Sequence, residues 1–263
     1  MAALDATIHS AIVAIIALGI AGGSASAQIH NVQSILATDA EEGLSGALSG
    51  SADWRTGNVS FLFLSATPVA RYRTGKHLVV GIFRGERRTS RGIKLVSRVF
   101  EHVRYRYSLT DRFLVEAFGQ HEFDGIKRLT IRALGGAGAK ADIIDGEGYG
   151  VGIALAYIFE YELLSEDAML ADSGDDDFAH RASSYLVGHY EIDDRLLLVE
   201  TIYVQPRLTD PSDVRLLGEI GLTVKVTKKL AFTTAFTLAY DSVPPETVES
   251  IDTALTSTVT FTF

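Results

Sequence analysis

Acidic side chains offer the first possible chemistry in this sequence. They gather in one irregular segment, Leu163 to Phe178, and comprise Glu166, Asp167, Asp172, Asp175, Asp176 and Asp177. Clustered carboxylates suit Ca²⁺, but this spacing does not match an EF-hand loop. Because unmatched runs of charge are usually solvated, we interpret the segment as an acidic loop and predict no metal site.

Histidine and serine offer a second chemistry, hydrolysis by a nucleophile and a base. The candidate bases are His102, His121, His180 and His189, and serines are frequent. No serine lies in a recognisable nucleophile motif, and the availability of residues does not make a triad. A strand histidine more often packs or hydrogen-bonds than catalyses. We predict no catalytic residues, and an outer-membrane lipase- or protease-like enzyme is kept as an alternative.

A glycine cluster, Gly135 to Gly138, invites comparison with phosphate-binding loops. Such a loop leads from a strand into a helix and carries a Gly-Lys-Ser or dinucleotide fingerprint. Here the cluster lies inside an alternating segment that no helical pattern follows. Close packing in a strand explains the glycines better, and we predict no cofactor.

The elements that must carry these residues alternate between apolar and polar side chains. The clearest is the C-terminal segment, Asp252 to Phe263. Its apolar face has Leu255, Val259, Phe261 and Phe263, and its hydroxyl face has Thr256, Thr258, Thr260 and Thr262. Successive side chains of a strand point to opposite faces. A transmembrane barrel turns the apolar face to lipid and the polar face to its lumen. Outer-membrane barrels end on an aromatic residue, so we interpret Phe261 and Phe263 as a terminal signal for barrel assembly.

Three consecutive central strands carry basic, acidic and basic side chains on their polar faces. Opposite charges on neighbouring strands stabilise the ladder modestly. Inside a barrel, they would line or partly fill the lumen. The charged residues predicted to face the lumen are Arg98, Arg104, Arg106, Glu116, Glu122, Arg128, Arg132 and Glu219. Glu101 is an exception on an apolar face, explained by a bulge or by misplaced strand ends.

About twelve strands fit into residues 43–263, an even number as single-chain outer-membrane barrels require. Alternate connections, near positions 74, 110, 142–148, 193 and 227, are short, while the acidic loop and the Pro244-Pro245 loop lie on the other side. We predict an all-β fold, a single antiparallel up-and-down transmembrane barrel. A soluble periplasmic barrel or sandwich that binds a lipid or small ligand is an alternative, because alternation does not say which face is wet.

The residues before the barrel divide into two parts. An apolar run, Ala11 to Ile20, precedes small residues that end at Ala27, which is typical of a cleaved signal peptide at residues 1–27. The N-terminal region departs from that pattern, since it has Asp5 and no basic residue. Residues 28–42 have no strand signal, and we predict a periplasmic lead-in with one short helical turn around Val32, Ile35 and Leu36. A plug inside the barrel is the alternative.

The overall charge narrows the range of partners. The formal charge of −9 argues against binding to nucleic acid or to an anionic surface. Cysteine is absent, so neither a disulfide nor a thiolate metal site can form.

The chain resembles a bacterial family described as salt-induced outer-membrane proteins, whose barrel domain has no known function. The matching features are Arg55-Thr56-Gly57-Asn58, Glu122-Phe123-Asp124-Gly125 followed by Arg128-Leu129-Thr130 and the glycines to Gly138, Tyr240-Asp241-Ser242, Pro244-Pro245, Asp252-Thr253 and the aromatic terminus. The resemblance spans roughly residues 43–263. It implies an outer-membrane barrel linked to salt or envelope stress, and it supplies no catalytic residues.

These observations favour a non-enzymatic outer-membrane barrel, either a narrow pore or a structural component of the envelope. The expected partners are outer-membrane lipid, the barrel-assembly machinery during insertion and, for a pore, a small solute or ion. A polar lumen and lipid-facing alternation require no cofactor.

Overall fold

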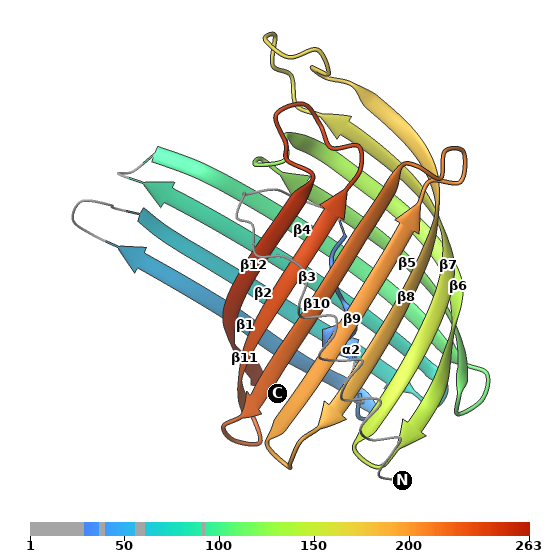
Figure 1. Cartoon of the computed structure of the whole chain (residues 1–263). Coiled ribbons are helices and arrows are strands. Elements are labelled where there is room, and N and C mark those ends of the chain that lie inside the picture. Colours follow the sequence, from blue (N-terminus) through green and yellow to red (C-terminus); the bar gives the residue numbers. More distant parts are fainter. Residues whose placement is uncertain (1–28, 37–39, 56–60, 91–92) are drawn as a thin grey trace, which may run out of the picture.

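The structure, a computed structural model, describes residues 29–36, 40–55, 61–90 and 93–263. The predicted signal peptide lies outside these residues. Every strand pairs antiparallel with its neighbour in sequence, and β1 pairs with β12 to close the barrel (Figure 1). The strands are β1 (Gly43–Arg55), β2 (Phe61–Thr74), β3 (His77–Ser90), β4 (Ile93–Ser108), β5 (Phe113–Asp124), β6 (Leu129–Gly146), β7 (Tyr149–Leu164), β8 (Asp176–Glu191), β9 (Leu196–Pro206), β10 (Val214–Lys225), β11 (Leu230–Asp241) and β12 (Ile251–Thr262). The predicted fold class, a closed antiparallel barrel of about twelve strands, is confirmed.

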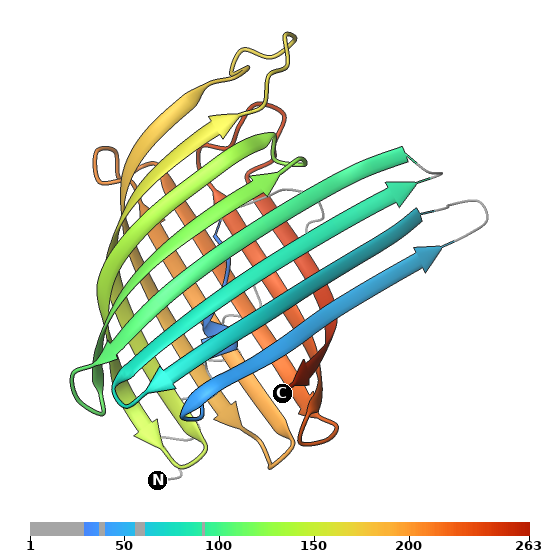
Figure 2. The same ribbon diagram turned by 180° about the vertical axis from the view of Figure 1, so that it is seen from behind.

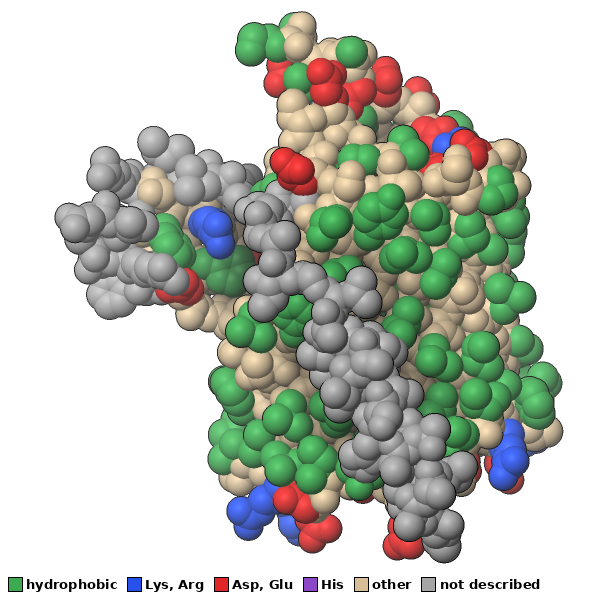
Figure 3. Space-filling model, viewed as in Figure 1, with side chains coloured by type: hydrophobic (Ala, Val, Ile, Leu, Met, Phe, Trp, Pro, Cys, Tyr) green, Lys and Arg blue, Asp and Glu red, His purple; other side chains and the backbone are tan. Residues whose placement is uncertain are grey.

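The barrel wall is apolar on the outside and polar on the inside. In β7, Leu155 is 64 % exposed, whereas Glu160 on the opposite face is 1 % exposed. Figure 3 shows hydrophobic side chains over the wall and charged side chains at its two ends. A soluble protein would bury the apolar face, and monomers in water rarely expose apolar patches of this extent. The chain therefore has the architecture of an outer-membrane β-barrel, and the soluble alternative is wrong. Among the described residues, no helix has the length and apolarity to cross a membrane.

The two ends of the barrel differ in their connections. At one end, the strands are joined by short turns at 75–76, 109–112, 147–148, 192–195 and 226–229. The acidic segment and the Pro-Pro segment connect strands at the other end. Figure 2 shows that β1 to β4 extend beyond their neighbours on this second side. We call the two ends the short-turn end and the long-loop end.

Glu101 remains on the outer face, with 55 % of its side chain exposed. Neither expected explanation holds, because β4 pairs with β5 in continuous register and the shift between β3 and β4 lies at Arg88 and Thr89. The register instead places Glu101 opposite His121, close to where β5 ends at Asp124. Its carboxylate lies 3.3 Å from the His121 ring. Glu101 lies near the middle of β4 itself, and the contact with His121 is the interaction that its outward-facing carboxylate makes.

The glycine cluster lies inside β6 and permits close packing. A Cβ atom at Gly138 would stand 2.3 Å from the Leu155 carbonyl oxygen, and one at Gly136 would stand 2.5 Å from the Phe118 ring. Backbone atoms cannot move aside to relieve such a close contact, whereas a flexible side chain can. The glycines thus keep β6 close to β7 and leave room for Phe118 inside.

We predict that Gly138→Val destabilises the folded barrel by about 1–3 kcal/mol, the usual cost of overpacking. The midpoint of urea unfolding in detergent micelles measures this effect. Gly218→Val is the matched control, because a Cβ atom there would meet nothing within 4 Å. Equal midpoints for the two variants would contradict the packing explanation.

Candidate functional site: a charged lumen that holds the N-terminal segment

The first part of the lumen is organised around the Glu116 carboxylate on β5. Arg104 Nη1 lies 3.0 Å and Arg106 Nε lies 3.1 Å from its Oε2. The Tyr185 hydroxyl donates to Oε1 across 3.1 Å. Arg104 also lies over the Phe118 ring, 4.6 Å from its centroid. These partners come from β4, β5 and β8, so the cluster ties distant parts of the wall together across the lumen.

A second cluster is organised around Glu160 on β7. Arg132 Nε donates to its Oε2 across 2.8 Å, and Arg215 Nη1 and Arg181 Nε donate to Oε1 across 2.7 Å and 3.3 Å. The other nitrogens of these guanidinium groups also bind acidic side chains. Arg215 reaches Glu162 and Asp241, Arg181 binds Asp213 through both terminal nitrogens, and Arg132 reaches Glu122. Ion pairs buried this deeply require such complete pairing, because an isolated buried charge is very unfavourable.

Part of the N-terminal region lies inside the barrel. Residues 29–36 run among the inward-facing side chains, and Gln33–Leu36 form the short helix α2 (Figure 1). Val32 and Gln33 are each 2 % exposed. Residues 29–36 therefore lie among the inward-facing side chains of the barrel, whereas Glu41 and Glu42, which belong to the same predicted lead-in, are exposed. We call residues 29–36 the N-terminal plug.

Polar contacts connect the plug to both walls. Arg106 donates to the Gln33 side-chain oxygen across 3.0 Å, and Gln33 donates to the Tyr203 hydroxyl across 3.0 Å. Asn31 donates to Glu219 across 2.8 Å. The His30 ring lies 2.9 Å from Glu122. Glu122, which also pairs with Arg132, thus joins the plug to one of the charged clusters.

Apolar contacts complete the fit. Ile29 packs with Ala154, Tyr185, Tyr203 and Leu217. Val32 packs with Val69, Val80, Ile82 and Phe100, and Ile35 and Leu36 cover the same cluster. Inward-facing apolar residues are unusual in a water-filled lumen, and here each cluster includes a plug residue. A small cavity of about 30 Å³ lies beside the plug, is lined in part by Ile29, His30 and Val32, and has room for only a few water molecules.

The charged residues predicted to face the lumen differ in where they lie and in what they contact. Arg104, Arg106, Glu116, Glu122 and Arg132 are buried in the clusters, and Glu219 holds the plug. Arg98 lies 2.9 Å from Asp124 near the long-loop end and is 31 % exposed. Arg128 does not belong to the lumen. It occupies the β5–β6 turn with a φ of 59° and binds the acidic loop.

Several central residues were absent from the predicted set, above all Glu160, Arg181, Asp213 and Asp241. Alternation along β7 could have found Glu160, which shares a face with Ile158 and Ala156. Asp213 and Asp241 lie at or beyond strand ends, where the two-residue alternation of a strand does not predict which way a side chain points. Only the sheet register brings them to Arg181 and Arg215.

The family model described as "Protein of unknown function, DUF481" matches residues 50–263. The chain belongs to this family. The matched range covers the barrel from within β1 onward and starts after the plug. No curated protein matches the chain.

Several solved barrels are similar to this family member. The NanC porin is 9 % identical, with 83 % of this chain and 97 % of that chain covered and a TM-score of 0.49. The KdgM porin is 10 % identical, with coverages of 84 % and 99 % and a TM-score of 0.46. The translocator domain of the autotransporter NalP from Neisseria meningitidis is 13 % identical, with coverages of 88 % and 91 % and a TM-score of 0.45.

The histidines considered as bases in this DUF481 barrel lie in different places. His102 is buried in the lumen beside Arg104, whose Nε lies 3.2 Å away. His121 and His180 contact Glu101 and Tyr157, which face outward. His189 lies near the short-turn end, opposite Val199 on β9. Within the described ranges, no group of three or more His, Asp or Glu side chains is arranged to hold a metal ion.

The acidic loop is fastened to the Pro-Pro loop. Arg128 Nη1 donates to Asp172 across 2.7 Å and to the Glu246 carbonyl across 3.1 Å. The Glu246 amide donates to Asp172, and the Ala171 amide donates to the Glu246 carboxylate, each across 2.7 Å. Partial burial alone would raise the pKa of Asp172, but the hydrogen bonds from Arg128 and Glu246 outweigh it and hold this pKa below its ordinary value.

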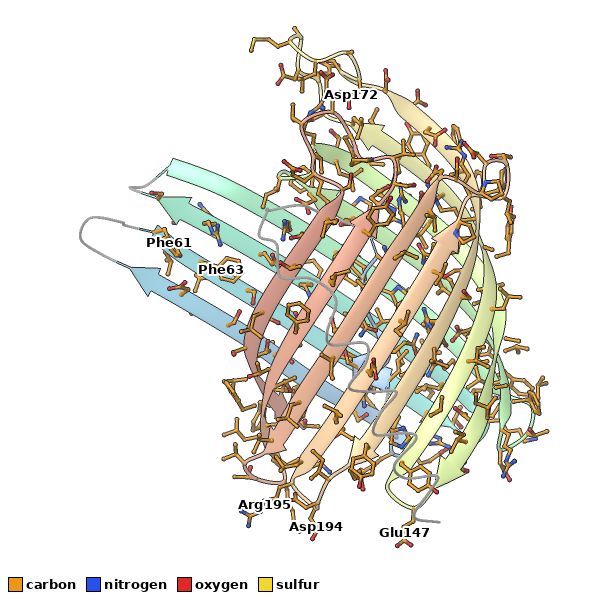
Figure 4. The ribbon with its side chains drawn as sticks, in the orientation of Figure 1. Phe61, Phe63, Glu147, Asp172, Asp194 and Arg195 are labelled. Atoms are coloured by element: carbon orange, nitrogen blue, oxygen red, sulfur yellow. The ribbon has the colours of Figure 1, made fainter. Side chains whose placement is uncertain are left out.

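We predict that Arg128→Ala loosens the acidic loop and speeds its cleavage by a nonspecific protease severalfold at neutral pH. Because the Asp172 pKa is lowered in the folded protein, its stabilising contribution is present at neutral pH and is lost as the pH falls through that lowered pKa. Wild-type protection should therefore approach that of the variant in strong acid. Arg195→Ala, in an exposed turn at the opposite end, is the control (Figure 4). Equal cleavage of both variants at neutral pH would contradict the prediction.

Proposed function

We propose that this protein is a non-enzymatic outer-membrane barrel that forms a narrow, gated pore for small polar solutes or ions. The N-terminal plug is the gate. The observation that carries the proposal is the position of residues 29–36 inside the lumen, where Val32 and Gln33 are almost fully buried. The plug contacts Arg106 on β4 and Tyr203 on β9, so it stands across the lumen between distant parts of the wall.

The chemistry of the contacts supports a removable plug. The wall is held by its own hydrogen-bonded ladder, to which the plug contributes no strand. The plug binds through side-chain contacts, which involve Ile29, His30, Asn31, Val32, Gln33, Ile35 and Leu36. When these contacts break, the walls keep their ion pairs and their register. The exposed lumen would then present arginine and glutamate side chains, which favours polar solutes over apolar ones.

A structural role in the envelope is the second candidate. The deeply buried ion pairs around Glu160 favour it, since they join β6, β7, β8 and β10 whether or not the plug is present. The link to salt or envelope stress also belongs to this proposal and rests on the family resemblance. For insertion, we propose that the barrel-assembly machinery recognises Phe261 and Phe263, whose rings stack with centroids 6.3 Å apart.

The deciding experiment is a planar-bilayer recording of the full chain and of a variant that lacks residues 29–36. We expect rare or no current from the full chain and discrete conductance steps from the variant. Retained heat-modifiable migration on a gel shows that the variant is still a barrel. A folded variant without conductance would remove the pore and leave the structural role.

A further inference from the structure

An acid and a base stand side by side on the outer face of the wall. Glu101 on β4 and His121 on β5 are opposite each other in the strand register. Glu101 Oε2 lies 3.3 Å from His121 Nδ1, and 55 % and 41 % of the two side chains are exposed. This contact uses one carboxylate oxygen and one ring nitrogen. Each side chain therefore keeps a second polar atom, Oε1 or Nε2, for another contact.

The pair lies at the level of the hydrocarbon. Tyr105, an outward-facing aromatic residue of the kind that marks a membrane interface, follows Glu101 on the same face of β4. The four residues from Tyr105 to Glu101 rise by about 10 Å along a strand tilted by about 45°, within a belt about 25 Å tall. The outward neighbours are apolar, since Val103 on β4 is 59 % exposed and Phe83, opposite Glu101 on β3, is 42 % exposed. Lipid chains cannot hydrogen-bond, so an ionisable pair at this depth indicates a contact with another polar group.

The wall beside the pair is flat. The outward-facing residues next to His121 on β5 and β6 are small, namely Ala117, Gly119, Ala133, Gly135 and Ala137. The nearest atoms to a Cβ atom at Gly119 and at Gly135 would be carbonyl oxygens 3.9 and 4.0 Å away, an ordinary contact distance. Packing within the barrel therefore does not require glycine at either position. A flat surface lets another membrane protein approach the acid and the base closely.

We propose that the outer face of β4 to β6 is an interface between two copies of this chain in the membrane, with Glu101 and His121 at its centre. A surface that carries an acid beside a base is complementary to itself under a two-fold rotation. A different protein would have to supply both groups in the reversed order, whereas a second copy already carries them. Figure 2 shows β1 to β4 on the side of the barrel that faces the viewer.

The chemistry of the two-fold contact closes on itself. With the axis along the membrane normal, each protonated imidazole donates Nδ1–H to Glu101 of its own chain and Nε2–H to the partner's Glu101. The four side chains then alternate in charge, and each carboxylate accepts two charge-assisted hydrogen bonds away from lipid. The interface does not depend on the pore or on the plug.

The first test measures association of the full chain in liposomes with a flexible bis-maleimide cross-linker. The chain has no natural cysteine, so one introduced thiol reports without background. Val103→Cys lies beside the pair, and Leu222→Cys, 39 % exposed on β10, lies on the opposite side of the closed barrel. We expect dimers from the first variant and single chains from the second. Single chains from both variants, or equal cross-linking of both, would overturn the proposal.

The same assay, repeated as the protein is diluted in lipid, gives a dissociation constant for the dimer. Adding Glu101→Gln to Val103→Cys should raise this constant by about tenfold or more, because two charge-assisted contacts between the copies are weakened. Heat-modifiable migration on a gel shows that the variant is a folded barrel. An unchanged constant would remove Glu101 from the interface and overturn the proposal.

The second test separates a contact between copies from a contact within one copy. Glu101→His gives the surface two imidazoles, and His121→Glu gives it two carboxylates, so neither variant is complementary to itself. We expect each variant alone to remain monomeric and an equal mixture, with a different affinity tag on each, to form heterodimers. A pair that acts only within one barrel would not be restored by mixing. Monomers in the mixture of the two folded variants would therefore overturn the proposal.

Discussion

Glu160→Gln is expected to destabilise the barrel by about 3–5 kcal/mol, the range seen when one partner of a buried ion pair is removed. The Glu160 side chain is 1 % exposed and accepts hydrogen bonds from Arg132, Arg181 and Arg215. A neutral amide preserves the shape but leaves these guanidinium groups with less negative charge around them. Water cannot compensate, because the arginines are themselves almost fully buried.

The urea midpoint of unfolding in detergent micelles, read from heat-modifiable migration, measures this loss. Glu147→Gln is the control for charge removal, since Glu147 is exposed in the turn between β6 and β7 (Figure 4). Its midpoint should remain that of the wild type. A change below about 1 kcal/mol in Glu160→Gln would mean that water reaches the cluster and screens it, as at a surface ion pair.

Val32→Asp is expected to drive the plug from the lumen without unfolding the barrel. Val32 is 2 % exposed and lies among Val69, Val80, Ile82 and Phe100. A carboxylate in this apolar cluster would lose its hydration, and Arg104, which lines the same cavity, is already bound by Glu116, so burying the new charge costs several kcal/mol. The plug is not part of the strand ladder, so its departure relieves the cost more easily than unfolding does.

A cysteine in place of Ile29, which is 7 % exposed, reports on this movement. We expect a thiol reagent to label it roughly a hundredfold faster in the Val32→Asp background, which corresponds to a shift of about 3 kcal/mol. Ser34→Asp is the matched control, because Ser34 is exposed on the same segment. Slow labelling in both backgrounds would show that the plug is fixed, and the gating proposal would then lose its basis.

The sequence by itself determined the architecture of the wall. Alternation in segments such as Asp252 to Phe263 depends only on the two-residue period of a strand, which is local and visible in the residues. The same period placed Arg104, Arg106 and Glu116 on one face. Turn residues and an even number of strands then led to a closed barrel, because a membrane tolerates no lipid-exposed sheet edge.

Only the tertiary structure decided what occupies the lumen inside that wall. Residues 29–36 have no strand period, and nothing local distinguishes a segment in the periplasm from one in the lumen. Their position follows from partners such as Tyr203 and Glu219, more than 150 residues away. The closure of the barrel by β1 and β12 is likewise a long-range property, since it depends on how two strands at opposite ends of the chain come into register. Local patterns fix which way a side chain points, whereas the closed register fixes which side chains meet.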